Sequence, residues 1–173
     1  NKLDKVYQYL NTATPASLVN KKTGNAISIN EIDSNTIFKP GDFRLTSYEW
    51  GVTYSGMLAA AKATGDKKYS EYAEQRLGLM AEAYEPLKKI FQQYHNSSNP
   101  LRTVIEPKAL DDAGAMCAAI IKTMQVNRNN KLQPLADNFI DFISNKQMRL
   151  KDGTLARNIC NRYLLLCYCK SSK

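Results

Sequence analysis

The helical fold is decided by residues 46–66, which read Thr46-Ser-Tyr-Glu-Trp-Gly-Val-Thr-Tyr-Ser-Gly-Met-Leu-Ala-Ala-Ala-Lys-Ala-Thr-Gly-Asp66. Thr46 and Glu49 have the spacing of a capping box, in which a hydroxyl and a carboxylate bind free N–H groups of the first helical turn. The helix continues to about Ala63, and Thr64-Gly65-Asp66 supplies a stop followed by a cap for the next helix. The stretch therefore predicts two helices joined by a short turn.

The same kind of pattern extends outward along the chain. Apolar residues at helical spacing predict further helices over residues 1–10, 67–83, 111–126 and 132–146, and Pro86 is expected to restart a segment over 87–94. Residues 11–42 are polar and broken by proline and glycine, which predicts a long loop. Asp152-Gly153 between leucines predicts a short β-hairpin near 149–157. We therefore expect an all-α fold of helical hairpins of the kind that closes into a toroid.

The positive charge of the chain gathers in one segment. The formal net charge is +8, and residues 148–173 alone carry six basic side chains against one acidic one. No basic helix with interleaved aromatic residues is present, so nucleic-acid binding is not expected. No apolar run approaches the roughly 18 to 20 residues of a membrane span. The chain opens Asn1-Lys-Leu-Asp without the apolar region of a signal peptide, and a removed signal would leave the same picture.

The cysteines and the single histidine do not form a metal-binding pattern. Cys117 lies on an apolar helix and reads as a core residue, while His95 lies in a polar stretch. Cys160, Cys167 and Cys169 fall within the last fourteen residues with no histidine nearby. The sequence therefore predicts neither a metal site nor a cofactor.

Two adjacent carboxylates, Asp111 and Asp112, stand at the entry to the apolar helix that begins at Ala113. Adjacent carboxylates repel each other and lose solvation when buried, so packing does not explain them. One interpretation is an N-cap followed by an acid in the first turn, stabilised by the positive end of the helix dipole. The other is a site that needs a proton donor or an acceptor for sugar hydroxyls.

Three blocks of sequence, in order, carry a resemblance to known enzymes. They are Asp42-Phe-Arg-Leu-Thr-Ser-Tyr-Glu-Trp-Gly-Val-Thr-Tyr-Ser-Gly-Met57, Leu110-Asp-Asp-Ala-Gly-Ala-Met116 and Asp152-Gly-Thr-Leu-Ala-Arg157. Over about residues 1–158 the chain resembles glycoside hydrolase families 88 and 105, the unsaturated glucuronyl and rhamnogalacturonyl hydrolases, and particularly their gut-Bacteroides members. The resemblance implies about half of an (α/α)6 toroid with a sugar site at one mouth. It also implies a periplasmic or secreted protein, although the chain itself leaves a cytoplasmic one open.

The resemblance further implies a substrate and a reaction. The substrate is an oligosaccharide that ends in a C4=C5 unsaturated uronic acid, as polysaccharide lyases leave on pectin or glycosaminoglycan fragments. An aspartic acid protonates the vinyl-ether double bond and water adds, instead of the usual attack at the anomeric carbon by a pair of carboxylates. The hemiketal then collapses, which opens the ring and releases the neighbouring sugar. The residue that donates and later accepts the proton needs a raised pKa.

Six positions are candidate site residues under this resemblance. The first active-site aspartate falls on Asp112, favoured by its spacing to Gly114, or on Asp111; it is expected to hold sugar hydroxyls and to raise the pKa of a second aspartate by repulsion. Trp50 and Tyr54 fall where the family has aromatic residues near the barrel mouth, or else are core residues of a helix face. Arg44 and Arg157 either meet a substrate carboxylate or lie on the surface.

The chain departs from the family after Arg157. The family continues into a Trp-x-Asp-Asp-x-x-Met segment that carries its catalytic acid, whereas residues 158–173 contain no acid and three cysteines. We therefore expect a partial toroid domain over 1–158 and an atypical cysteine-rich basic tail over 159–173, produced by a frameshift or an early stop. Exposed helix flanks would favour a homodimer. The alternative to an active hydrolase is an inactive carbohydrate-binding or vestigial helical fragment.

Overall fold

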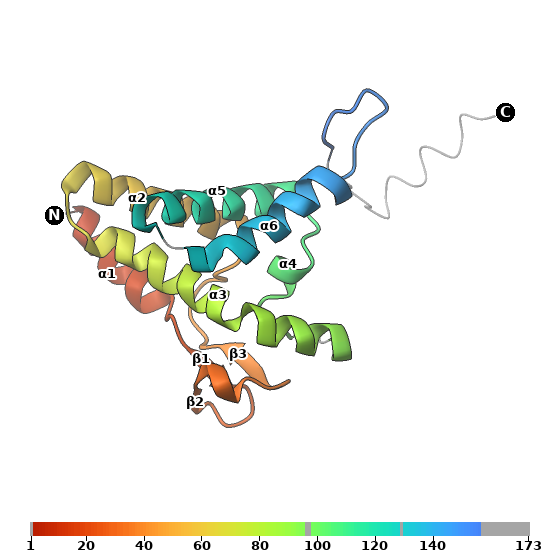
Figure 1. Cartoon of the computed structure of the whole chain (residues 1–173). Coiled ribbons are helices and arrows are strands. Elements are labelled where there is room, and N and C mark those ends of the chain that lie inside the picture. The colour runs from red at the N-terminus through yellow and green to blue at the C-terminus, as the bar shows by residue number, and fades with distance from the viewer. Residues whose placement is uncertain (1, 96–97, 129, 157–173) are drawn as a thin grey trace, which may run out of the picture.

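Six α-helices and a small sheet make up the computed structural model, which describes residues 2–95, 98–128 and 130–156 (Figure 1). The helices are α1 (Lys2–Ala13), α2 (Tyr48–Thr64), α3 (Lys68–Tyr94), α4 (Arg102–Ile105), α5 (Leu110–Asn127) and α6 (Gln133–Asp141). Two 3-10 turns, Ile29–Glu31 and Asn130–Leu132, and a π-helical turn, Phe142–Lys146, complete the helical elements of this part of the chain. The predicted all-α class with a short β-hairpin is confirmed.

The core lies between α2, α3, α5 and α6, and α2 packs most closely on α5. A Cβ atom added at Gly51 of α2 would lie 2.5 Å from the carbonyl carbon of Ala115 and 2.7 Å from the backbone nitrogen of Met116. Only a residue without a side chain permits this approach. Apolar side chains from all four helices fill the space between them: Met57, Leu58, Leu77, Met80, Leu87, Met116, Ile120, Leu135 and Phe139.

The structure corrects the expected break at Pro86, because α3 is one helix of 27 residues with Pro86 inside it. Proline has no N–H and therefore forfeits the helical bond to the carbonyl of Glu82. Tyr84, Leu87 and Phe91 are buried on either side of the proline. Their packing against the core offsets the missing bond and keeps the helix continuous.

Residues 11–42, predicted to be a loop, contain the end of α1 and a three-stranded antiparallel sheet. The strands are β1 (Leu18–Asn20), β2 (Ala26–Ile27) and β3 (Thr36–Phe38), in the order β2-β1-β3, with Leu18 opposite both Ile27 and Phe38. Strands of two or three residues are too short to show an alternating pattern, so the prediction missed them. The sheet lies below α3 in Figure 1, and β3 leads into the segment that precedes α2.

A buried arginine ties α1 to α3. Arg76 of α3 is 1% exposed and donates hydrogen bonds to the Thr14 hydroxyl (3.1 Å), to the Tyr72 carbonyl (3.1 Å) and to Asn11 (3.2 Å). Its guanidinium also stacks on the Tyr72 ring, 3.7 Å from the centroid. Burial lowers the pKa of Arg76. These contacts fix the end of α1 and hence the chain that leads from it into the sheet.

The predicted hairpin is present as far as residue 156, where the described part of the chain ends. Arg149 and Leu155 form one β-bridge, and the Leu150 N–H donates to the Thr154 carbonyl at 2.9 Å. Gly153 has φ +85°, the left-handed conformation expected of the Asp-Gly turn. Arg157, the cysteine-rich segment and the predicted domain boundary lie outside the described residues. Within them, no helix has the length and apolar character needed to cross a membrane.

Candidate functional site

The two carboxylates lie in the first turn of α5, but neither is its N-cap. Ala109 occupies that position with extended backbone angles (φ −123°, ψ 132°), so Asp111 and Asp112 are the second and third residues of the helix. Asp111 is exposed and Asp112 half-buried. The interpretation of the pair as N-cap and first helical residue is therefore wrong, because the helix begins at Leu110, two residues earlier than that interpretation requires.

Asp112 instead caps a different helix. Its Oδ1 atom accepts the backbone N–H of Tyr48, the first residue of α2, at 2.7 Å. The predicted capping box of Thr46 and Glu49 does not form: the N-cap of α2 is Ser47, which makes no side-chain capping bond, and the Thr46 hydroxyl accepts from the Thr103 hydroxyl at 2.9 Å. Asp112 thus lies where the N-termini of α2 and α5 meet.

Further charges surround this meeting point. The Ser47 hydroxyl, hydrogen-bonded to Glu49, is the main cause that lowers the pKa of the Glu49 carboxyl. The positive charge of Arg44 lowers the pKa of Glu49 further, and the negative charge of Asp111 opposes this effect. Arg44 and Asp111 are therefore each close enough to act on Glu49, although they come from separate segments of the chain.

The structure places Trp50 and Tyr54 in the core, at 5% and 0% exposure. The Trp50 Nε1–H donates to the Tyr72 hydroxyl at 3.3 Å, and the Phe43 ring stacks on Trp50 with centroids 4.6 Å apart. The Tyr54 hydroxyl donates to the Leu45 carbonyl at 3.0 Å, and burial raises the pKa of Tyr54 well above its ordinary value. Both side chains contact the segment 43–45 from its core side. In this structure Trp50 and Tyr54 are therefore core residues of a helix face, which is the second of the two alternatives given for them.

Two exposed aromatic residues, which were not singled out from the sequence, lie at or just before the start of α2. Tyr48, whose N–H binds Asp112, is 47% exposed, and Phe43 is 41% exposed four residues before the N-cap, Ser47, with its inner face on Trp50. The exposure of Tyr48 could have been predicted from the sequence. Each residue turns the helix by about 100°, so Tyr48 points away from the face that carries Trp50 and Tyr54. An aromatic face of this kind suits the C–H face of a sugar ring.

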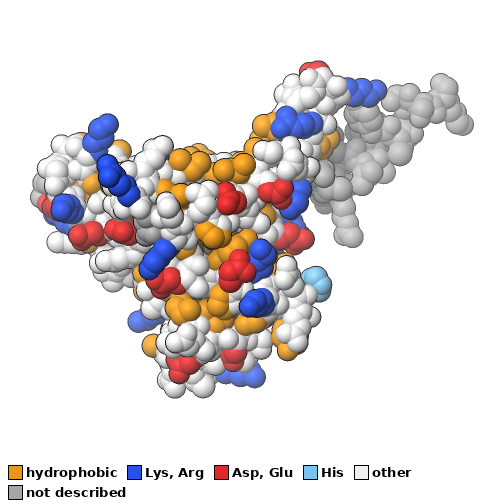
Figure 2. All heavy atoms as spheres, viewed as in Figure 1, with side chains coloured by type: hydrophobic (Ala, Val, Ile, Leu, Met, Phe, Trp, Pro, Cys, Tyr) orange, Lys and Arg blue, Asp and Glu red, His pale blue; other side chains and the backbone are white. Residues whose placement is uncertain are grey.

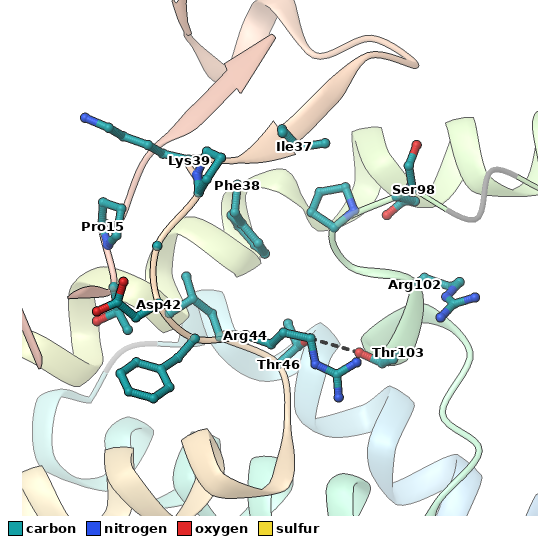
Figure 3. A pocket seen from close by; sticks show the side chains of 17 residues that line it. Pro15, Ile37, Phe38, Lys39, Asp42, Arg44, Thr46, Ser98, Arg102 and Thr103 are labelled. Carbon is teal, nitrogen blue, oxygen red and sulfur yellow. Dashed lines mark hydrogen bonds between the residues drawn. The ribbon is translucent and has the colours of Figure 1, made fainter. Parts of the chain in front are cut away.

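A pocket of about 400 Å³ is lined in part by residues 43–46, just before the start of α2. It lies between the end of α1, the segment from β3 to α2, and residues 98–103 (Figure 3). Arg44 and Thr46 belong to its lining, whereas Asp111 and Asp112 do not. Only Ser47 separates Thr46 from Tyr48, so the pocket and the Asp112 carboxylate lie at either end of a short stretch of chain. The structure thus places Asp111, Asp112 and Arg44 around one region.

The described residues offer no place for a metal ion, since they contain no cluster of three or more His, Cys, Asp or Glu side chains arranged to hold one. His95 ends α3 on the surface in a left-handed conformation (φ 46°). Cys117 is buried at 6% exposure, as predicted, and burial raises the pKa of its thiol.

Comparison with known protein families gives one match: the family model described as Glycosyl Hydrolase Family 88 matches residues 18–165. This range includes β1 to α6, and it therefore contains Arg44, Glu49 and both carboxylates of α5. No curated protein matches the chain.

Proposed function

Since the chain belongs to glycosyl hydrolase family 88, whose model covers most of its 173 residues, we propose that it acts on oligosaccharides ending in an unsaturated uronic acid. In this proposal Asp112 serves as the proton donor, in place of the acid that the family resemblance leads us to expect beyond Arg157. The protonated carboxyl gives its proton to C4 of the double bond, and the carboxylate that remains takes a proton from the water that adds to C5. The hemiketal formed at C5 then collapses, which opens the sugar ring and releases the neighbouring sugar.

The position of Asp112 is the observation that carries this proposal. Its Oδ1 atom is fixed by the Tyr48 N–H at 2.7 Å, so that the transferable proton belongs on Oδ2. A catalytic acid must be held in this way, because a small misplacement of the reacting group costs much of its effect. The residue that donates this N–H, Tyr48, also has an exposed ring, which supplies a surface on which the sugar can stack.

The test is turnover of an unsaturated rhamnogalacturonan disaccharide, followed by loss of the ultraviolet absorbance of its double bond. We expect absorbance to fall with the unmodified protein and not with Asp112→Asn, which keeps an oxygen for the Tyr48 N–H but has no proton to transfer. Asp111→Asn is the matched control, and it should retain more activity than Asp112→Asn. Equal loss in both variants, or full activity in Asp112→Asn, would refute the assignment of Asp112.

A non-catalytic carbohydrate-binding protein is the second candidate, and the sequence beyond Arg157 favours it. Residues 158–173 contain no Asp or Glu, where the family resemblance leads us to expect a second aspartate. This candidate predicts that the disaccharide binds with measurable affinity in calorimetry while its double bond survives indefinitely.

We further propose that two copies associate through apolar side chains on one side of the helices. Figure 2 shows apolar side chains gathered along the edge formed by α2 and α5. Large apolar residues on these helices and on α6 are more than a third exposed: Val52, Ile121, Val126 and Ile140. Exposed apolar groups of this number and proximity favour association.

A further inference from the structure

The pocket of about 400 Å³ that residues 43–46 help to line combines apolar walls with a basic edge. Phe38 and Pro100 contribute apolar surface, and Figure 3 shows Phe38 pointing toward the segment that carries Arg44 and Thr46. A volume of this size lies within the range of pockets that enclose small ligands. Apolar walls suit the C–H face of a sugar, while the edge determines which substituents the sugar can carry.

Two arginines form the basic edge. Arg44 reaches the pocket from the segment before α2, and Arg102 reaches it from the start of α4; both side chains are exposed. In Figure 3 both lie on the Thr103 side of the pocket, while Lys39 extends away from them. Among the described residues of the lining, Asp42 carries the one carboxylate, and it accepts a hydrogen bond from the Tyr9 hydroxyl at 3.2 Å. The edge is therefore positively charged.

The segments that carry the arginines are fixed to each other. The Thr103 hydroxyl, next to Arg102, donates to the Thr46 hydroxyl, two residues from Arg44, at 2.9 Å. Asn99 holds the start of the 98–103 segment through bonds of 2.9 Å to the Leu87 carbonyl and from the Leu101 N–H. The two segments are therefore held relative to each other, so an anion that binds both arginines does not have to bring the segments together.

We propose that this pocket binds the sugar next to the unsaturated residue and that Arg44 and Arg102 recognise a carboxylate or sulfate on that sugar. The assignment rests on the proposed function, since it needs the unsaturated sugar to sit at Asp112. The two residues from Thr46 to Tyr48 span at most about 7 Å of chain, so the pocket and the acid lie within reach of neighbouring sugars. Arginine suits this task because its planar fork binds such anions with two parallel hydrogen bonds.

The test is calorimetric binding of two disaccharides that share an unsaturated uronyl end and differ only by a sulfate on the second sugar. The protein is used with Asp112→Asn as background, so that neither ligand is consumed. We expect the sulfated disaccharide to bind at least tenfold more tightly than the neutral one. The double substitution Arg44→Gln and Arg102→Gln should lower its affinity at least tenfold, and that of the neutral disaccharide less than twofold.

Lys39→Gln is the matched control, because it removes a charge from the same lining on a side chain that extends away from the arginines; it should change neither affinity more than twofold. Equal binding of the two disaccharides, or an arginine effect no larger than that of Lys39→Gln, would overturn the assignment and leave the proposed function standing. Inorganic sulfate that binds as tightly as the sulfated disaccharide would also overturn it, since the pocket would then select a free anion. If neither disaccharide binds, the proposed function fails together with the inference.

Discussion

Asp112 has two tasks at the scale of a single residue, because the carboxyl group proposed as the acid also caps α2 through its 2.7 Å bond to Tyr48. The two tasks can be separated by substitution. Asp112→Ala should lower the free energy of unfolding by about 1 kcal/mol, the usual cost of losing a helix cap, whereas Asp112→Asn should lower it by less than half as much. Urea denaturation measures both. A destabilisation by Asn as large as that by Ala would show that Oδ1 does not cap the helix.

The sequence pointed to the acidic pair through adjacency and family resemblance, but not to the bond that holds it. Asp112 and Tyr48 are 64 residues apart, so no local pattern relates them. The predicted capping box failed for a related reason: Ser47, and not Thr46, is the N-cap of α2, and the Thr46 hydroxyl bonds to Thr103, which is 57 residues away. Trp50 and Tyr54 share one helix face, and whether that face meets core or solvent depends on partners such as Tyr72 and Leu45.

At the scale of an element, α2 offers a matched pair of glycines. Gly51→Ala would place a methyl group 2.5 Å from a backbone atom of α5 and should cost about 1 to 3 kcal/mol through overpacking. Gly56 lies in the same helix with nothing within 4 Å of an added Cβ, so Gly56→Ala should gain up to about 1 kcal/mol from helix propensity alone. Urea unfolding of both variants checks the difference; equal stability would mean that α2 and α5 lie farther apart.

Helices of ten or more residues were predictable, because their apolar spacing reports the buried face. The continuous α3 was not, since Pro86 is a local signal and the packing of Tyr84, Leu87 and Phe91 that overrides it is a tertiary one. The small sheet was missed because its strands contain only two or three residues each. The hairpin near 149–157 was predicted from its Asp-Gly turn between leucines, a signal that is local and therefore visible in the sequence.

At the scale of the whole molecule, the exposed apolar edge predicts a dimer. Light scattering should give a mass of twice 19.5 kDa, and Val126→Glu on α5 should return it to that of one chain, since a charge opposes burial of the edge. Val6→Glu is the control, because Val6 is similarly exposed but lies on α1. A uniform single-chain mass for the unmodified protein would contradict the proposal. Whether the helical pairs belong to a toroid stays a prediction.

The bond between Asp112 and Tyr48 also determines when the site can exist. During synthesis, Phe43, Arg44 and Tyr48 leave the ribosome more than sixty residues ahead of α5, and the Tyr48 N–H at the start of α2 then lacks the Asp112 carboxylate. A nascent chain that stops short of residue 112 therefore contains the exposed rings without the proposed acid. On the proposed function, catalysis can begin only when α5 docks, so the newly made protein would be inactive until its central helices have come together.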